Sequence, residues 1–420
     1  MRILFVTPYA PSLIRVRPYQ LMGGLVRRGH QIALAAVWTA EAERSALQAL
    51  AARNVQVRCR RMSTWRSVWN CLGAAGTGEP FQSVYSWHPG LQRDILRAVR
   101  EFRPDVIHVE HLRGARYGIN LPPVAERRIP AIWDSVDCIS LLFRQARIQS
   151  RSARGRWMTR VELPRTEAYE GWLASQFDRV LVTSPVDGRA LEDVAKARGE
   201  SARGKLRVLR NGVDLEYFSP GGGSRDPATL VLTGKMSYHA NVTAALHLVE
   251  DIMPAVWAAR PDASVLIAGK DPPSEVRALQ HRAANPNPNG NPSVVVTGTV
   301  SDIRPFLRRA TLAAAPLVYG VGIQNKVLEA MACGTPVVAS AQAASALAAK
   351  PDRDLLIGAE AGAFAHRILD LLGSPGLRDA VGRAGRQYVE THHNWDGVAV
   401  SLESIYREAI DSLAVRHASA

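Results

Sequence analysis

The feature that most constrains this chain is an alternation, repeated along most of its length, of short apolar β-type runs with helical segments. Runs such as 3–6, 31–37 and 179–184 are rich in Val, Ile, Leu and Ala without strict polar alternation, which indicates strands buried on both faces. Strands of this kind, separated by helices, form a parallel sheet with helices on each side. The sequence therefore predicts an α/β protein built from doubly wound, Rossmann-like units.

The alternation occurs as two series, and the chain of 420 residues is long enough for two domains. The second series follows 206–209 and contains the predicted strands 229–233, 264–268, 294–297, 312–316 and 336–339. Between the series, 211–227 is rich in Gly, Pro, Ser and Asp, as linkers are. We expect an N-terminal domain over 1–208, a ligand-binding C-terminal domain over 209–390, and a helical tail over 391–420 that packs back on the N-terminal domain.

The chain is strongly basic, with 52 Lys and Arg against 38 Asp and Glu and a net charge of +14. Such an excess favours a nucleic acid, an anionic membrane or an anionic substrate as partner. No nucleic-acid-binding module is recognisable, so we expect no nucleic acid. Two arginine clusters are interleaved with apolar side chains and are either solvated faces or peripheral contacts to an anionic leaflet. The clusters are Arg58, Arg60, Arg61 and Arg66 with Trp65 and Trp69, and Arg144, Arg147, Arg151, Arg154, Arg156, Arg160 and Arg165.

Cysteine usage and hydropathy bear on the compartment. Cys59, Cys71, Cys138 and Cys333 have no paired spacing, which argues against a zinc site or a disulfide framework and favours a reducing cytosol. No run approaches the roughly 18 uninterrupted apolar residues of a spanning helix. We expect a cytoplasmic protein whose membrane contact, if it has one, is peripheral and at the inner face.

The segment 316–338 carries the strongest functional signal. A strand ends, a Gly-containing loop follows, a helix begins near Ile323, and a Gly-Thr-Pro turn leads to the next strand. The backbone N–H groups and the dipole at such a helix start favour an anion such as a diphosphate. Lys326 and Glu329 are three residues apart and share one helix face. A cation and a carboxylate placed in this way suit a sugar nucleotide.

This segment, Gly-Ile-Gln-Asn-Lys-Val-Leu-Glu-Ala-Met-Ala-Cys-Gly-Thr-Pro-Val-Val, resembles the donor-binding signature of retaining glycosyltransferases of family 4. The resemblance extends over most of the chain, because 210–214, 233–236, 268–269 and 297–300 follow in family order. Family 4 enzymes have the GT-B fold, in which two Rossmann-like domains face a central cleft. The resemblance thus implies that the C-terminal domain binds a nucleotide sugar and that the N-terminal domain lies on the acceptor side.

The resemblance also implies roles for individual residues. Glu329 matches the residue that binds the donor ribose, Lys235 matches the cation that contacts the diphosphate, and the loop 321–325 matches the backbone that holds the sugar and phosphates. The implied donor contacts are Gly234, Lys235, Gly322, Ile323, Gln324, Asn325, Lys326 and Glu329. The chain departs from the family at Val321, where a carboxylate is common, and at Asn241, which stands with Ala240 in place of a second lysine. We expect Lys326 to restore that charge.

Two residues of the N-terminal half are implied as catalytic. Asp134 follows a strand at the position where many family members carry the His of the reaction centre, and His111 is placed to contact the acceptor. His108 and Glu110 share one face of their strand whereas His111 points away, so we expect no metal there. Asp-Arg-Asp at 352–354 matches a metal motif of another glycosyltransferase fold, and we interpret it as structural.

Together these features predict a metal-independent retaining glycosyltransferase without a cofactor. It would move a hexose from a UDP- or GDP-sugar to a carbohydrate or lipid-linked acceptor, in surface polysaccharide or glycolipid synthesis. In retaining enzymes of this fold the acceptor attacks from the leaving-group side and the donor phosphate takes its proton, so no protein nucleophile is expected. The alternatives are a GT-B sugar-nucleotide epimerase, which needs an acid–base pair, and a non-catalytic partner subunit. Arg15 and Arg17 either approach a phosphate or only begin a helix.

Overall fold

The computed structural model divides the chain into two compact units, which are described separately. It describes residues 1–119, 121–123, 128–150, 153–282, 288, 290 and 292–418. Unit 1 comprises 1–143, 160–211 and 395–420, and unit 2 comprises 144–159 and 212–394. The chain therefore passes from one unit to the other four times, and the final segment belongs to unit 1.

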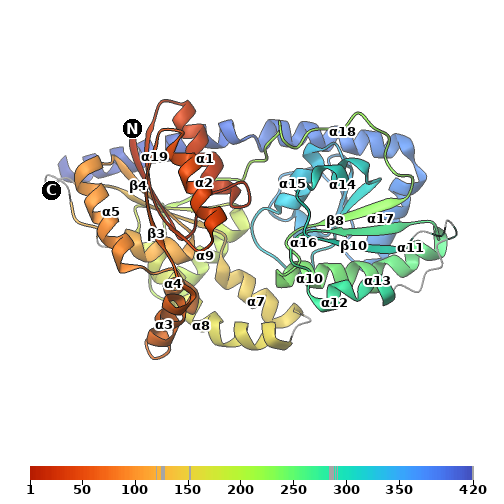
Figure 1. Cartoon of the computed structure of the whole chain (residues 1–420), viewed down its shortest axis with the longest axis horizontal. Helices are drawn as coiled ribbons and strands as arrows, with labels where there is room; N and C mark the ends of the chain where they lie inside the picture. The colour runs from red at the N-terminus through yellow and green to blue at the C-terminus, as the bar shows by residue number, and fades with distance from the viewer. Residues whose placement is uncertain are drawn as a thin grey trace. The chain divides into compact units, whose positions relative to one another are not determined.

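Unit 1 contains a seven-stranded parallel sheet with the order β3-β2-β1-β4-β5-β6-β7 (Figure 1). The strands are β1 (Arg2–Thr7), β2 (Gln31–Trp38), β3 (Val55–Arg61), β4 (Val106–Glu110), β5 (Ala131–Val136), β6 (Arg179–Val182) and β7 (Leu206–Val208). All five residues of β4 and five of the six in β1 are buried, because helices cover both faces of the sheet. The strand order changes direction between β1 and β4, and ligands of doubly wound sheets bind at the carboxyl ends of the strands beside such a point.

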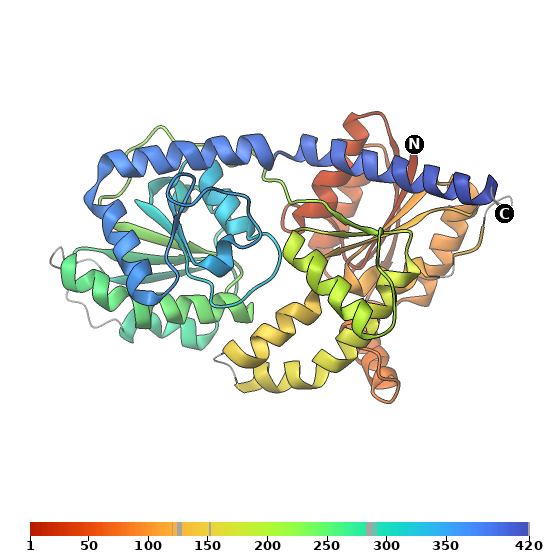
Figure 2. The same cartoon turned by 180° about the vertical axis from the view of Figure 1, so that it is seen from behind.

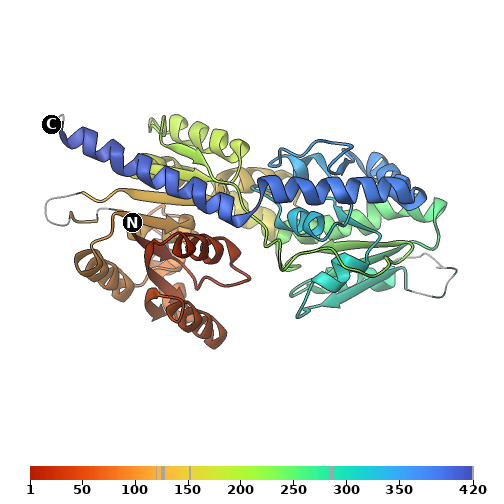
Figure 3. The ribbon, with the colours of Figure 1, turned by 90° about the horizontal axis from the view of Figure 1, so that it is seen from above.

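The helices of unit 1 include one from the end of the chain. They are α1 (Val16–Arg27), α2 (Glu41–Ala51), α3 (Thr64–Ala74), α4 (Phe81–Tyr85), α5 (Pro89–Phe102), α6 (His111–Ala115), η1 (Arg116–Gly118), α9 (Pro185–Ala197) and α19 (Trp395–Ala418). Helix α19 lies beside α1 (Figures 2 and 3), where Trp395, Leu402 and Tyr406 join Leu21 and Leu25 in one apolar core. Helices α7 (Ile139–Gln149) and α8 (Ala153–Gln176) contribute residues to both units.

Unit 2 contains a six-stranded parallel sheet with the order β10-β9-β8-β11-β12-β13. The strands are β8 (Thr229–Thr233), β9 (Ser264–Ala268), β10 (Val294–Gly298), β11 (Leu312–Ala315), β12 (Val337–Ala339) and β13 (Leu356–Ile357). The helices are α10 (His239–Leu246), the π-helix η2 (His247–Ile252), α11 (Met253–Ala259), α12 (Ser274–Arg277), α13 (Leu279–Arg282), α14 (Arg304–Arg309), α15 (Asn325–Ala332), α16 (Ala341–Ala344), α17 (Ala361–Gly373) and α18 (Pro375–His392). The switch point of this sheet lies between β8 and β11.

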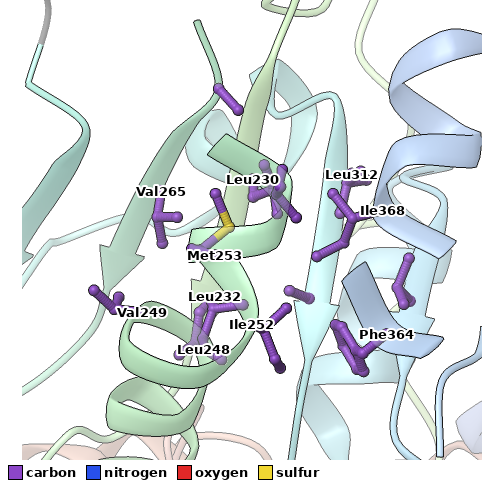
Figure 4. Close-up of a cluster of buried hydrophobic side chains, with 14 of the residues drawn as sticks. Leu230, Leu232, Leu248, Val249, Ile252, Met253, Val265, Leu312, Phe364 and Ile368 are labelled. Carbon is purple, nitrogen blue, oxygen red and sulfur yellow. The ribbon is translucent and has the colours of Figure 1, made fainter. Parts of the chain in front are cut away.

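The core of unit 2 forms where the continuous α10–η2–α11 segment packs with α17 over the sheet (Figure 4). Leu232 of β8, Ile252 of η2 and Phe364 of α17 are almost completely buried there. The segment His239–Ala259 is long and apolar enough to cross a membrane, but most of its apolar window is buried inside unit 2. Its hydropathy is therefore that of a core helix.

The fold class predicted from the sequence is confirmed, since each unit is a doubly wound parallel sheet. Two strands were not predicted. Strand β3 has the sequence Val-Gln-Val-Arg-Cys-Arg-Arg, whose arginines are tolerated because β3 is an edge strand, and β13 has only two residues. The predicted tail 391–420 begins at the last residues of α18, and after a break at 393–394 it consists of α19.

Candidate functional site

In unit 2 the loops after β8 and β9 meet at two glycines. Gly234 and Gly269 have φ of +146° and +157°, which side chains rarely allow. A Cβ atom on Gly269 would lie 1.8 Å from the carbonyl oxygen of Gly234. Glycine at 269 lets the two backbones pass this closely, and a Cβ atom on Gly234 would lie 2.8 Å from the side-chain nitrogen of Asn241. The contact holds the loop that presents Lys235, whose side chain is exposed at the carboxyl end of β8.

The glycine loop after β11 is held on both sides at one residue. The side-chain carbonyl of Gln145 accepts from the Gly320 N–H at 2.9 Å, and the Gln342 amide donates to the Gly320 carbonyl at 2.7 Å. At the end of this loop Gln324 is the N-cap of α15, but its side chain makes no capping hydrogen bond and donates instead to the Val321 carbonyl at 3.0 Å. The start of α15 thus has the local geometry that binds anions.

The side chain of Asn241 connects the two loops. Its amide nitrogen donates to the Lys235 carbonyl at 2.9 Å, and its carbonyl oxygen accepts a hydrogen bond from the ammonium of Lys326. The Lys326 charge therefore lies beside the residue that replaces the second lysine of the family pattern. Sequence reasoning named Lys326 and Lys235 but gave Asn241 no role, because only the fold brings α10 and α15 together.

Burial perturbs both charged residues of α15. The pKa of Lys326 is lowered to about 8 by burial, although the neighbouring Glu329 charge opposes the shift. The pKa of Glu329 is raised to about 7 by burial, with Lys326 acting in the opposite direction. Both groups therefore lie in a medium that strengthens their interaction with a polar ligand. A bound diphosphate would favour the charged form of Lys326.

A stacked pair of side chains lies close in sequence to both loops. The ring of His239, at the start of α10, stacks on that of Tyr319 with centroids 5.5 Å apart, and its Nδ1 is 2.8 Å from the Tyr319 hydroxyl. Tyr319 is fully buried directly before Gly320, and burial lowers the pKa of His239. The pair connects the start of α10 to the residue that precedes Gly320. Sequence reasoning did not identify the pair, because His239 belongs to no motif and the sequence does not show that it meets Tyr319 of the segment 316–338.

In unit 1 the two predicted catalytic residues are located at the carboxyl ends of β4 and β5. Asp134 is completely buried, and its two oxygens accept from Nε and Nη2 of Arg17 at 2.8 and 3.1 Å. His108 Nε2 lies 3.5 Å from the same carboxylate. Arg17 also donates to the Asn211 side chain at 2.7 Å. Burial alone would raise the pKa of Asp134, but the Arg17 charge leads the groups that outweigh it and lower the pKa to about 2. The same contacts occupy Arg17, which is not available for a phosphate.

His111 begins α6 with a positive φ of +64°, and its Nδ1 accepts from the Arg113 N–H at 3.2 Å. Burial and the charges of Arg113 and Arg15 lower the pKa of His111 to about 3, so the ring is neutral at physiological pH. Its neighbour Glu110 is buried and accepts from the Tyr9 hydroxyl at 2.8 Å through Oε1, while Oε2 has no hydrogen-bond partner among the residues that the structure describes. The catalytic roles of Asp134 and His111 remain predictions.

The backbone beyond Asp134 is irregular. Val136 has φ of +68°, a costly conformation for a β-branched residue, and the pairing of β5 with β6 shifts register between Asp134 and Val136.

Among the residues that the structure describes, no three His, Cys, Asp or Glu side chains gather as a metal site. Asp354 pairs with Arg353 and accepts from the Lys350 N–H, as a structural residue would.

Comparison with protein families assigns both halves of the chain. Residues 15–217 match the family described as Glycosyltransferase Family 4, and residues 227–374 match Glycosyl transferases group 1. The chain belongs to glycosyltransferase family 4. This assignment confirms the family to which the donor-loop signature pointed, and the two parallel sheets are those of the GT-B fold.

Curated relatives of this family 4 chain include a GDP-mannose-dependent monoacylated alpha-(1-6)-phosphatidylinositol monomannoside mannosyltransferase of Corynebacterium glutamicum. The two are 29% identical over 47% of this chain and 55% of that protein. Alpha-maltose-1-phosphate synthase of Mycobacterium tuberculosis is 31% identical over 48% of this chain and 57% of its own length. The chain thus spans little more than half the length of these relatives.

Solved structures show the fold over nearly the whole chain. Sucrose-phosphate synthase from Thermosynechococcus elongatus aligns with a TM-score of 0.67 and 18% identity, covering 98% of this chain and all of that one. Anabaena HepE in complex with UDP and glucose aligns with a TM-score of 0.64 and 14% identity, covering 97% and 100%. At these identities the likeness concerns the fold alone.

Proposed function

We propose that this protein is a retaining glycosyltransferase that moves a hexose from a nucleoside diphosphate sugar to a carbohydrate or lipid-linked acceptor. The observation that carries the proposal is the junction made by Asn241 in unit 2, which brings the Lys326 ammonium to the Gly234–Lys235 loop. The junction brings the Lys326 ammonium to the backbone of Lys235 at the sheet's switch point, beside the start of α15, where, among the described residues, the Gln324 side chain does not cap the helix. This arrangement fits a diphosphate.

Each group would have a distinct role in the reaction. As the glycosyl–phosphate bond breaks, negative charge grows on the departing diphosphate, and Lys326, Lys235 and the amides at the start of α15 would stabilise it. Glu329, one turn further along α15, would accept hydrogen bonds from the ribose hydroxyls. Because Asn241 holds the Lys326 ammonium before the reaction, this group needs little reorganisation when the charge develops. In this scheme the acceptor's proton goes to the donor phosphate.

The donor base and the acceptor belong to the proposal as classes only. One curated relative is named as GDP-mannose-dependent, and one structural relative was crystallised with UDP and glucose, which supports UDP- and GDP-sugars as the donors to test. We further propose that the reaction takes place in the cytoplasm, at the inner membrane face, during surface polysaccharide or glycolipid assembly. Among the described residues no disulfide joins the four cysteines, two of which are buried, and this suits a reducing compartment.

A turnover assay tests the proposal. The purified protein is incubated with UDP-glucose, UDP-galactose or GDP-mannose and a detergent extract of bacterial lipids, and the release of nucleoside diphosphate and the anomeric configuration of the product are measured. We expect one donor to be consumed with retention, and Lys326→Met to lower the rate on the order of 10²-fold. Glu275→Gln, on α12, is the matched control and should leave the rate unchanged.

Two outcomes would overturn the proposal. A change in the donor sugar without release of nucleoside diphosphate would indicate the epimerase instead. Binding of a nucleotide sugar without turnover, for every donor and lipid extract tested, would indicate a non-catalytic partner subunit.

A further inference from the structure

Helix α3 has the reverse of the usual amphipathic pattern. Its large apolar residues Trp65, Val68, Trp69 and Leu72 are 76%, 44%, 70% and 60% exposed. Their spacing of three, one and three residues places them on a single face of the helix. A helix of a soluble protein normally turns such a face toward the core, so the exposure of these four large apolar side chains is unusual.

The opposite face of α3 holds the helix in unit 1 through small and polar residues. The Asn70 side chain donates to the carbonyls of Val84 and Trp87 at 3.0 and 2.9 Å. Ser67 and Ala74 are buried on this side, and Ser63 caps the helix by accepting from the Arg66 N–H. Helix α3 therefore cannot rotate its tryptophans inward without losing these bonds. The apolar face is fixed outward.

The position and charge of α3 determine which partner fits this face. Figures 1 and 2 show α3 beside α4 at the margin of unit 1, beyond the end of the sheet. Its sequence, Thr-Trp-Arg-Ser-Val-Trp-Asn-Cys-Leu-Gly-Ala, contains one charged residue, the exposed Arg66, and no acid. Exposed Arg61 precedes the helix, and the whole chain carries a net charge of +14. Tryptophan is the residue that prefers the membrane–water interface, and arginine pairs with anionic headgroups.

We propose that α3 is a membrane-docking helix that lies in the interface of an anionic bilayer with Trp65, Val68, Trp69 and Leu72 among the acyl chains. Arg61 and Arg66 then reach the lipid phosphates. Arg58 and Arg60 contribute less, because they pair with Glu101 and Asp94. The second arginine cluster carries no part of the proposal, because Arg144 and Arg147 belong to unit 2, Arg151 and the side chains of Arg154 and Arg156 lie outside what the structure describes, and Arg160 and Arg165 lie on α8 rather than on α3. The docking does not depend on the proposed reaction.

Vesicle binding tests the proposal without any donor present. Purified protein is sedimented with vesicles of phosphatidylcholine alone and with vesicles containing about 30% phosphatidylglycerol, and its tryptophan emission is recorded. We expect binding to the anionic vesicles, with a blue shift of the emission and weaker binding at high salt. The double variant Trp65→Ala, Trp69→Ala should lower the fraction bound at least 10-fold. Trp172→Ala, at an exposed tryptophan of α8, should bind as the wild type does.

The double variant should also fold normally, because the exposed side chains make few contacts and Ala is a good helix former; an unchanged melting temperature checks this. The proposal would be overturned if wild-type protein failed to bind anionic vesicles, or if the double variant bound as well as wild type. A dimer in light scattering that the double variant abolishes, together with absent vesicle binding, would show instead that α3 docks a second copy of the chain.

Discussion

The buried pair of Arg17 and Asp134 gives the sharpest stability prediction. Asp134→Asn removes the charge but keeps the shape, so the guanidinium of Arg17, which is only 5% exposed, loses its counter-charge inside the core. Breaking a buried pair on one side costs about 3–5 kcal/mol, because the remaining charge is left without compensation. We expect a loss of this size in the free energy of unfolding at pH 7.

The pKa of Asp134 provides a second estimate of the same interaction. A carboxyl with a pKa of about 2 in the folded protein, against an ordinary value of 3.8, contributes ~2 kcal/mol that is fully present above about pH 4 and is lost as the pH falls through 2. Wild-type protein should therefore lose stability in this acidic window. The variant Asp134→Asn has no carboxyl at this position, so the part of the acid-induced loss of stability that is due to Asp134 should be absent from it.

Urea unfolding followed by circular dichroism measures the loss, and hydrogen exchange in β1, β4 and β5 assigns it to unit 1. The matched control is Asp396→Asn, whose side chain is 78% exposed in its pair with Arg27 and should cost less than about 0.5 kcal/mol. A loss below about 1 kcal/mol for Asp134→Asn would refute the reasoning. Unchanged stability with abolished turnover would instead support a direct catalytic role for Asp134.

Three further predictions follow from single contacts. Burial raises the pKa of Glu110 to about 8, so the stability that comes from its bound proton is fully present below about pH 4.5 and is lost as the pH rises through 8. Urea unfolding midpoints measured at pH 5, 6.5 and 8 should therefore fall less with rising pH for Glu110→Gln than for wild type. Parallel pH profiles of the two proteins would contradict this. Gly269→Ala places a Cβ atom 1.8 Å from the Gly234 carbonyl oxygen, so the free energy of unfolding obtained from thermal melts should fall by several kcal/mol. Gly222→Ala, which has open space around it, should melt at the wild-type temperature. Asn241→Ala removes the acceptor of the half-buried Lys326 ammonium, and nucleotide affinity measured by calorimetry should change at least several-fold; unchanged affinity would contradict the junction's role.

The fold was predictable because hydrophobic burial on both faces of a parallel strand leaves a clear trace in the sequence. Strands such as β4, with all five residues buried, show this trace, whereas β3 at the sheet edge carries polar residues and arginines between its apolar ones. Strand β13 is too short for any pattern. The periodicity of burial therefore decides which elements a sequence reveals.

The candidate site was predictable only where its residues are close in sequence. Lys326 and Glu329 could be found because one helix face carries both. Asn241 could not, because its contacts with Lys235 and Lys326 depend on how α10 packs beside α15. Arg17 was open to two interpretations from the sequence, and its burial against Asp134, 117 residues away, answers that question.

The central claim is that Lys326, at the start of α15, binds the diphosphate of a nucleotide donor. Titration calorimetry with UDP, GDP and ADP on wild type, Lys326→Met and the exposed-site control Lys350→Met tests it most directly. We predict that wild type binds at least one of UDP and GDP, that Lys326→Met weakens this binding 10-fold or more, about 1.4 kcal/mol, and that Lys350→Met does not change it. Absence of nucleotide binding by the wild type, or equal affinity in Lys326→Met, would contradict the account.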